Sequence, residues 1–366
     1  MRWTWIATMV GALAVAGCAT APPRPPAQVF YPPPPDAPRI QHLATYSGER
    51  DLGELDSALA RFVAGEDNAG PQLRQPYGAA MFDGKLYVAD TKAPGLVVFD
   101  IANRKFSRVT GAGNGRMQRP INVTIDADGT KFVTDTGRNA ILVYDRNDRF
   151  LRSYGDDKQF KPVDTAIAGD RLYVVDIEHH QIQVLDKRTG QRLQTFGKSG
   201  NGEGDLFQPT NIAIGPDGDL YVVETGNFRV QRFKPDGKHV RFYGEIGNLP
   251  GQFARPKGIA VDRSGRLYVG DAAFQNVQVF TNDGRLLMPF GQTDEPGRAL
   301  NLPASVSIDY DSVALFRSKA DPKFAIEYVI LVVSQFVPNK VDVFGFGRMS
   351  GVAYAPDDAP AARPAK

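Results

Sequence analysis

The chain has 366 residues, and its 43 basic and 41 acidic side chains nearly cancel to a formal net charge of +2. This balance excludes the strong basic excess by which nucleic-acid-binding proteins attract phosphate, so no nucleic-acid partner is expected. Cys18 is the single cysteine and there are only four histidines, which excludes an internal disulfide and leaves little material for a zinc site.

Residues 1–17 have the features of a secretion signal. Arg2 provides a short positive segment, and the apolar run from Trp5 to Ala16 is shorter than the roughly 20 residues that span a bilayer. The run ends in small residues directly before the lone cysteine, Val15-Ala16-Gly17-Cys18, and this pattern resembles the bacterial lipobox. An ordinary signal peptide with a chance cysteine is the alternative interpretation.

The lipobox resemblance implies cleavage before Cys18, a diacylglycerol on its thiol, and acyl chains such as palmitate that hold the protein to a membrane. Ala19 stands where an aspartate would imply retention at the inner membrane, so the resemblance implies an outer-membrane lipoprotein of the bacterial cell envelope that faces the periplasm. Residues 18–39 contain nine prolines, which predicts a semi-rigid polyproline-II spacer. A PxxP docking motif is the alternative for this segment.

From residue 40 to residue 350 one pattern recurs. A strand begins just after each of six prolines, which are spaced by 42 to 47 residues. These are Pro76, Pro120, Pro162, Pro209, Pro256 and Pro303. Further strand patterns follow each proline, such as KLYVAD, GLVVFD and KFSRVT in the first repeat, with turns rich in Pro, Asp and Gly between strands. Four strands in a repeat of this length predict one blade of a β-propeller.

The sixth repeat has no clear fourth strand, and Ile40 to Gly48 (IQHLATYSG) reads like the fourth strands of the other repeats. We therefore expect this segment to pair with Lys340 to Phe346 and close a ring of six blades. The predicted fold class is all-β, a six-bladed β-propeller closed by its N-terminal strand, with short helical insertions. A polar, Pro/Ala-rich tail follows at residues 351–366.

The segments PKGIAVD at 256–262 and RLYVGD at 266–271 resemble the NHL repeat, and the resemblance covers roughly residues 40–347. The whole layout, with its lipobox, YPPPP segment and six repeats, resembles a group of bacterial six-bladed NHL-repeat propeller lipoproteins. Because propellers host many unrelated activities, the resemblance implies the fold far more than the function.

Two insertions interrupt the repeats. Asp51 to Ala64 has leucines at helical spacing, and Asp309 to Phe324 lengthens a turn of the sixth repeat, with a short helix expected around Ser312 to Phe316. Long insertions in compact folds are often functional, and packing over blade edges is the alternative.

Candidate functional residues fall on one face of the ring, where the fourth-to-first and second-to-third strand connections meet; we call it the loop face. Acidic residues end five of the second strands. They are Asp90, Asp135, Asp176, Glu224 and Asp271, with Ser334 at the sixth position. Five acids in repeat register favour a structural role in the following turn over catalysis.

Asn122, Asp164 and Asn211 stand two residues after their repeat prolines and are expected to converge at the mouth of the central channel. Their oxygens are of the kind that Ca²⁺ prefers, and six-bladed lactonase-type propellers hold calcium with such residues. One formal negative charge falls short of a full calcium site, so channel polarity without a metal is the other interpretation.

Arg138, His179, His180 and Arg229 lie in second-to-third turns and are further candidates for ligand binding. The arginines match the repeat, whereas the histidine pair departs from it and is either solvated surface or a contact to a ligand or metal.

Two functions follow from these residues. One is a membrane-anchored, non-enzymatic propeller that binds a protein or a polysaccharide on its loop face. The alternative is a calcium-dependent hydrolase or lyase built on Asn122, Asp164 and Asn211.

Overall fold

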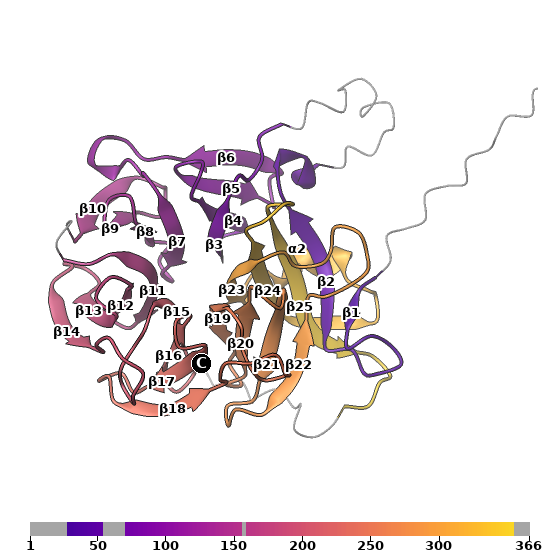
Figure 1. Cartoon of the computed structure of the whole chain (residues 1–366). Coiled ribbons are helices and arrows are strands. Elements are labelled where there is room, and N and C mark those ends of the chain that lie inside the picture. The colour runs from indigo at the N-terminus through magenta and orange to yellow at the C-terminus, as the bar shows by residue number, and fades with distance from the viewer. Residues whose placement is uncertain (1–27, 54–69, 156–158, 355–366) are drawn as a thin grey trace, which may run out of the picture.

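The computed structural model describes residues 28–53, 70–155 and 159–354, and these form a ring of six antiparallel sheets (Figure 1). Five sheets have four strands and the sixth has five. This confirms the predicted six-bladed β-propeller. Cys18 and the rest of the secretion signal, residues 54–69 of the first insertion, and most of the tail lie outside the described residues.

The first strand of each blade lies innermost and lines the central channel (Figure 1). Each begins at its repeat proline, a position where the missing N–H removes no ladder hydrogen bond. The six are β3 (Pro76–Phe82), β7 (Pro120–Ile125), β11 (Pro162–Ala168), β15 (Pro209–Ile214), β19 (Pro256–Val261) and β23 (Pro303–Asp309).

The second and third strands form the core, because each blade buries its two faces against its neighbours. The second strands are β4 (Lys85–Asp90), β8 (Lys131–Asp135), β12 (Arg171–Asp176), β16 (Leu220–Glu224), β20 (Leu267–Asp271) and β24 (Phe324–Ser334). The third strands are β5 (Leu96–Asp100), β9 (Ala140–Tyr144), β13 (Gln181–Asp186), β17 (Arg229–Phe233), β21 (Asn276–Phe280) and β25 (Lys340–Met349). Tyr87 of blade 1, for example, packs with Val133 and Leu142 of blade 2.

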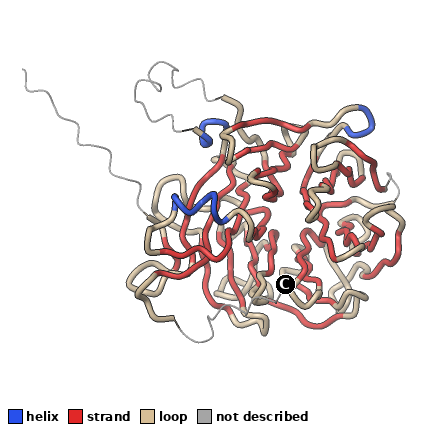
Figure 2. Tube along the Cα trace, turned by 180° about the vertical axis from the view of Figure 1, so that it is seen from behind, coloured by secondary structure: helices blue, strands red, loops and turns tan. Residues whose placement is uncertain are grey.

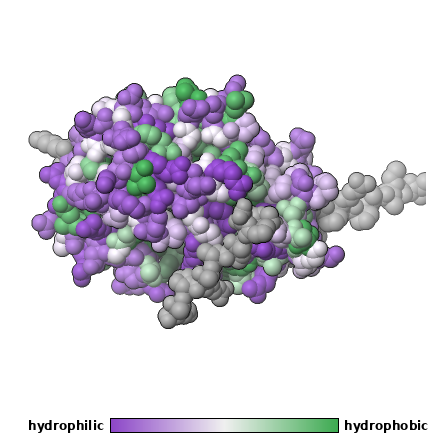
Figure 3. Space-filling view, turned by 90° about the horizontal axis from the view of Figure 1, so that it is seen from below, coloured by the Kyte–Doolittle hydropathy of each residue, from purple (hydrophilic) through white to green (hydrophobic). Residues whose placement is uncertain are grey.

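The fourth strands form the outer rim, and most of their side chains are exposed or half-buried. They are β6 (Lys105–Val109), β10 (Phe150–Tyr154), β14 (Arg192–Phe196), β18 (His239–Tyr243) and β22 (Leu286–Phe290). Seen from the side, the ring is largely hydrophilic with scattered apolar residues (Figure 3). Among the described residues, no helix is long and apolar enough to cross a membrane.

Blade 6 is completed by β2 (Ile40–Tyr46), as predicted. Ile40 pairs with Phe346 and Tyr46 pairs with Val341 in an antiparallel register. Buried polar groups reinforce this closure: Asp342 on β25 accepts a 2.7 Å hydrogen bond from the Thr45 hydroxyl of β2. The ring therefore joins the two ends of the propeller and leaves no unpaired edge on β25.

The spacer prediction is wrong for the residues just before β2. Phe30–Tyr31 form a short strand, β1, that pairs with Ile40 and Gln41 and adds a fifth strand to blade 6. The buried side chains of Val29 and Tyr31 explain the difference, because they contribute to the apolar core between blades 5 and 6. An extended spacer would leave both side chains in water.

The insertion in blade 6 contains a short helix, α2 (Val313–Phe316), followed by a 3₁₀ turn, η3 (Arg317–Lys319), and this confirms the predicted helix (Figure 2). Phe316 is buried against the core shared by blades 6 and 1, so this insertion packs onto the ring. Other 3₁₀ turns are η1 (Glu49–Leu52) and η2 (Gly113–Gly115). The helix predicted from Asp51 falls mainly in residues outside the described ranges.

Removal of the closing strand tests the ring. A chain lacking residues 1–47 loses the buried side chains of Ile40, Leu43 and Tyr46, each worth about 1.5–3 kcal/mol, and exposes the edge of β25. We expect it to unfold at markedly lower denaturant concentration and to aggregate. A chain lacking only residues 1–27 is the control and should remain monomeric with unchanged stability. Equal stability of the two truncated chains, measured by urea titration and light scattering, would contradict the closure.

Candidate functional site

The acids that end the second strands hold the turns of the loop face. The Asp135 carboxylate is fully buried and accepts four backbone N–H bonds, from Gln118 (2.6 Å), Arg119 (2.9 Å), Gly137 (2.9 Å) and Arg138 (3.1 Å). Asp90 and Asp271 accept the equivalent bonds in their blades. In blade 6 the Ser334 hydroxyl accepts the N–H of Asn301. These contacts confirm the structural role predicted for the series.

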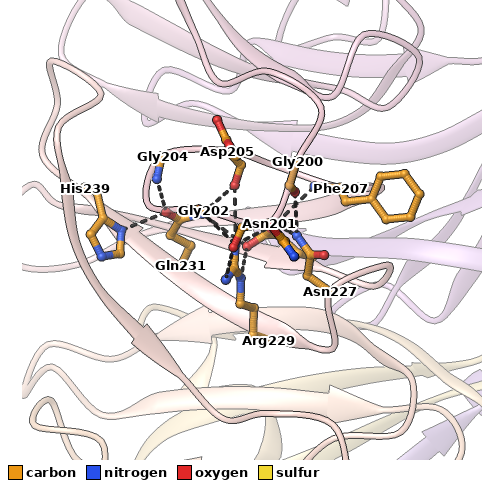
Figure 4. Close-up of polar contacts among 11 residues, drawn as sticks. Gly200, Asn201, Gly202, Gly204, Asp205, Phe207, Asn227, Arg229, Gln231 and His239 are labelled. Carbon is orange, nitrogen blue, oxygen red and sulfur yellow. Dashed lines mark hydrogen bonds and ion pairs between the residues drawn. The ribbon is translucent and has the colours of Figure 1, made fainter.

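Arg229 fastens the loop that enters blade 4 (Figure 4). Its guanidinium donates to the buried carboxylate of Glu224 at 2.7 Å and to the carbonyl oxygens of Asn201 and Gly202 at 2.9 and 3.3 Å. Arg138 holds the corresponding loop of blade 2. Its guanidinium donates to the carbonyl oxygens of Asn114 and Arg116, in and just after η2, at 2.7 and 3.0 Å. Both arginines therefore stabilise the conformation of loops on the loop face.

The two histidines of the pair contact different partners. The Nδ1 atom of His179 lies 2.7 Å from the Asp176 carboxylate, and nearly half of its side chain is exposed. His180 accepts a hydrogen bond from the backbone N–H of Gln208, and its ring lies 5.1 Å from that of Phe207. Among the described residues, no group of three or more His, Cys, Asp or Glu side chains is placed to hold a metal ion.

Asn122, Asp164 and Asn211 come together, as predicted. The Asp164 carboxylate accepts a 2.6 Å bond from the Asn122 amide and a 3.2 Å bond from the Asn211 amide. It also accepts the backbone N–H groups of Thr165 and Ile212 at 2.8 and 2.9 Å. All three side chains are more than nine-tenths buried. Burial raises the pKa of Asp164 from 3.8 to about 7, although the four donated hydrogen bonds oppose the shift.

This arrangement does not fit calcium. Ca²⁺ requires six to eight oxygen ligands, whereas both carboxylate oxygens of Asp164 are already bonded to N–H groups. The amide nitrogens of Asn122 and Asn211, not their oxygens, point at the carboxylate. The three residues therefore form a hydrogen-bonded cluster centred on the Asp164 carboxylate.

The cluster lies at one end of a cavity of about 470 Å³ in the channel. The lining runs from Asn122, Asp164 and Asn211 along the first strands to Asp126 and Asp311, which follow β7 and β23. Its lining contains no residue from the fourth-to-first or second-to-third connections. The cavity thus opens away from the loop face, on the opposite side from the one expected; we call this opposite side the far face.

Tyr77 and Lys257 lie one residue nearer the loop face than the positions that form the cavity floor. The Lys257 ammonium lies 5.2 Å from the centre of the Tyr77 ring and 3.3 Å from the Gln335 side-chain oxygen. Burial and the charge of Arg255 lower the pKa of Lys257 to about 8, and burial and Asp164 raise the pKa of Tyr77. Sequence reasoning missed both residues, and their departure from the small or aliphatic residue of most other repeats was the available signal.

Comparison with known proteins supports the same fold. Residues 208–233 match the NHL repeat family. No curated protein matches the chain. The protein is a six-bladed β-propeller that carries an NHL repeat.

Several solved structures resemble this propeller. A gluconolactonase from Xanthomonas campestris is 16% identical with a TM-score of 0.57, over 88% of this chain and 99% of that one. A virginiamycin B lyase from Staphylococcus aureus is 14% identical with a TM-score of 0.51, over 75% and 95%. A chain of a nidogen/laminin complex is 17% identical with a TM-score of 0.50, over 59% and 80%. At these identities the likeness shows the fold alone.

Because the pKa of Asp164 is raised, the unfolding free energy of the propeller should depend on pH, and a substitution of Asp164 tests this. The folded propeller holds a proton on this carboxyl between about pH 4 and pH 7, where the unfolded chain has released it. Stability that is present below pH 4 is therefore lost as the pH rises to about 7. Asp164→Asn does not titrate, so its unfolding free energy relative to the native protein should increase by about 2 kcal/mol between pH 5 and pH 7.

Urea denaturation at a series of pH values measures this difference. Glu178→Gln, which changes an exposed acid in a turn of blade 3, serves as the control and should show no such trend. A constant offset between Asp164→Asn and the native protein from pH 5 to pH 8 would show that Asp164 is already ionised in the folded state at pH 5.

Proposed function

We propose that this propeller is a non-enzymatic binding scaffold, anchored to the bacterial outer membrane through lipidated Cys18, that binds a protein partner through its loop face in the periplasm. The observation that carries the proposal is a set of apolar side chains exposed on that face. They are Phe207 (38% exposed), Ile246 (65%), Leu249 (62%), Phe336 (59%) and Val337 (70%). All five lie on connections of blades 4, 5 and 6.

Exposed aliphatic and aromatic groups gathered on neighbouring loops are typical of protein-binding surfaces. The turn between β20 and β21 and the connection into blade 6 enclose a hollow of about 450 Å³. Its lining combines Ala273, Phe274, Ala299 and Leu300 with Gln275, Gln292, Thr293 and Asp294. A polysaccharide offers hydroxyl groups to bind, and the isoleucine, leucine and valine of this patch do not meet that need.

The same face carries positive charge around the end of the channel. Arg119, Lys161 and Arg255 occupy equivalent positions directly before their repeat prolines, and all three are exposed. None of them forms an ion pair with another described residue. A partner with acidic groups beside an apolar segment would complement this surface.

The calcium-dependent hydrolase or lyase is not favoured by a comparable observation. The Asp164 carboxylate is already bonded by the Asn122 and Asn211 amides, and the cavity that these residues line opens away from the loop face. The resemblance to a gluconolactonase and a lyase concerns the shape of the propeller at low identity and carries no catalytic residue to this chain.

Site-specific cross-linking in intact cells tests the protein-binding proposal. A photoreactive residue near position 248 should capture a discrete partner, and the double substitution Ile246→Ser with Leu249→Ser should reduce capture at least about tenfold, because the buried apolar contact is lost. Leu193→Ser is the matched control, since Leu193 is 52% exposed but lies on the outer strand β14. Capture that survives the double substitution, or that is reduced equally by Leu193→Ser, would contradict binding through this patch.

The anchor has an independent test. Cys18→Ser removes the thiol that would receive the lipid, so we expect the variant to leave the membrane fraction or to keep its signal sequence. Fractionation of cells and mass measurement of the N-terminus distinguish these outcomes from the native protein. A variant that is fully processed and still membrane-bound would contradict lipid anchoring.

A further inference from the structure

The loop-face end of the channel carries positive charge that no described acid neutralises. Two positions in each repeat flank the repeat proline, one directly before it and one directly after it. Among these twelve positions are four cations, Arg119, Lys161, Arg255 and Lys257, and no aspartate or glutamate. None of the four cations forms an ion pair with another described residue. A surface with this uncompensated charge attracts anions.

Lys257, in blade 5, is held in place by contacts from two other blades. Its ammonium lies 3.3 Å from the side-chain oxygen of Gln335 in blade 6 and 5.2 Å from the centre of the Tyr77 ring in blade 1. An ammonium group has three N–H donors, and Gln335 is the hydrogen-bond acceptor that this one reaches in the described part of the chain. Two donors therefore remain for a ligand.

These side chains are open to solvent on the loop face. Arg255 is exposed, and Lys257 and Tyr77 are half-buried, so part of each side chain is accessible. None of the three lines the cavity that opens on the far face. A ligand therefore reaches them from the loop face. Gln335 directly precedes Phe336, one of the exposed apolar residues of that face, so the charged and apolar groups adjoin along the chain.

Burial without a counter-ion makes Lys257 a receptor for negative charge. Burial and repulsion by the Arg255 guanidinium lower the pKa of Lys257 to about 8, and no carboxylate opposes them. The Arg255 guanidinium also acts on Tyr77, where it opposes the rise in pKa caused by burial and Asp164. Arg255 is therefore within electrostatic reach of both other side chains. An anion bound at this place would stabilise the charged form of Lys257 and reduce the repulsion between the two cations.

We propose that Lys257 and Arg255 form a carboxylate-binding site at the loop-face end of the channel. The half-buried ammonium of Lys257 binds the carboxylate, and the exposed guanidinium of Arg255 supplies the second positive charge. Tyr77 and Gln335 position the ammonium. The carboxylate belongs to an acidic side chain or the C-terminus of the protein partner that contacts the neighbouring apolar residues, so this inference rests on the proposed function.

A phosphate group does not fit this site as well as a carboxylate does. A phosphate monoester carries nearly two negative charges and three acceptor oxygens, and proteins usually bind it with several backbone N–H groups of a helix N-terminus or a turn. Here Pro256 has no N–H, and the backbone N–H of Arg255 is bonded to the Asp271 carboxylate at 3.0 Å. The site supplies side-chain charge, which a carboxylate with one negative charge can satisfy.

Chemical labelling of the full-length protein tests the site without a partner. At pH 8 about half of the Lys257 amines are neutral and can react with acetic anhydride. We expect millimolar succinate to slow acetylation of Lys257 by about fivefold, because a bound carboxylate stabilises the protonated amine. Sodium chloride at the same ionic strength and 1,4-butanediol should have little effect. Lys238, which is exposed in the turn between β17 and β18, is the matched control and should react at an unchanged rate, as mass spectrometry of the peptides would show.

Capture of the partner in intact cells tests the source of the carboxylate. With the photoreactive residue near position 248, Lys257→Gln and Arg255→Gln should each reduce capture by about tenfold, because each removes one of the two charges. Lys257→Arg keeps the charge and should retain most of the capture. Lys238→Gln removes an exposed lysine away from the site and should leave capture unchanged.

Several outcomes would overturn the inference. Acetylation of Lys257 that succinate does not slow, or slows equally at Lys238, would show that there is no carboxylate site. Slowing by inorganic phosphate and not by succinate would contradict the choice of a carboxylate. Slowing by succinate with undiminished capture in Lys257→Gln would show that the partner does not supply the carboxylate.

Failure of this inference and failure of the proposed function give different results. Capture that falls in the Ile246→Ser and Leu249→Ser double variant but not in Lys257→Gln supports the proposed function and refutes the site. If no partner is captured, the proposed function fails, and the succinate labelling still decides whether the site exists. Urea denaturation of Lys257→Gln and Arg255→Gln confirms that a loss of capture does not come from loss of the fold.

Discussion

The structure depends on the need of each blade to cover two apolar faces. A four-stranded sheet from this sequence has second and third strands that are buried along almost their whole length, and one sheet cannot remove both of its faces from water. Tyr87 and its equivalents fill the space between neighbouring blades. A ring is the arrangement in which every blade has two neighbours, so the pairing of β2 with β25 stabilises all six blades together.

Radial packing brings the backbone ends of many strands together at the loop face, where their N–H groups need acceptors. The buried acids at the ends of the second strands meet that need, and Asp135 with its four donors shows how one carboxylate organises two loops. Arg229 and Arg138 stabilise the same loops by donating hydrogen bonds to their carbonyl oxygens. These acids and arginines would suggest catalysis if each were considered alone, but their hydrogen bonds show that they stabilise the loops.

Function is therefore sought where the structure leaves groups unsatisfied. On the loop face these are exposed apolar residues such as Ile246 and Val337, which gain most from a protein partner. In the channel they are the buried oxygens of Asn211 and Ser305, two residues of the cavity wall. The Asp164 cluster lies between the two regions, at the end of the cavity nearer the loop face.

The sequence by itself determined the number of blades, the positions of the four repeated strands of each blade and the closing role of Ile40 to Tyr46, because these depend on local patterns repeated six times. It also determined that Asn122, Asp164 and Asn211 meet, since repeat register places equivalent residues at one level of the ring. Only the tertiary structure decided that their amide groups face Asp164, that Phe30 and Tyr31 add a strand, and that the cavity opens on the far face. These features depend on side-chain directions and on contacts between distant blades, and repeat spacing contains no information about either.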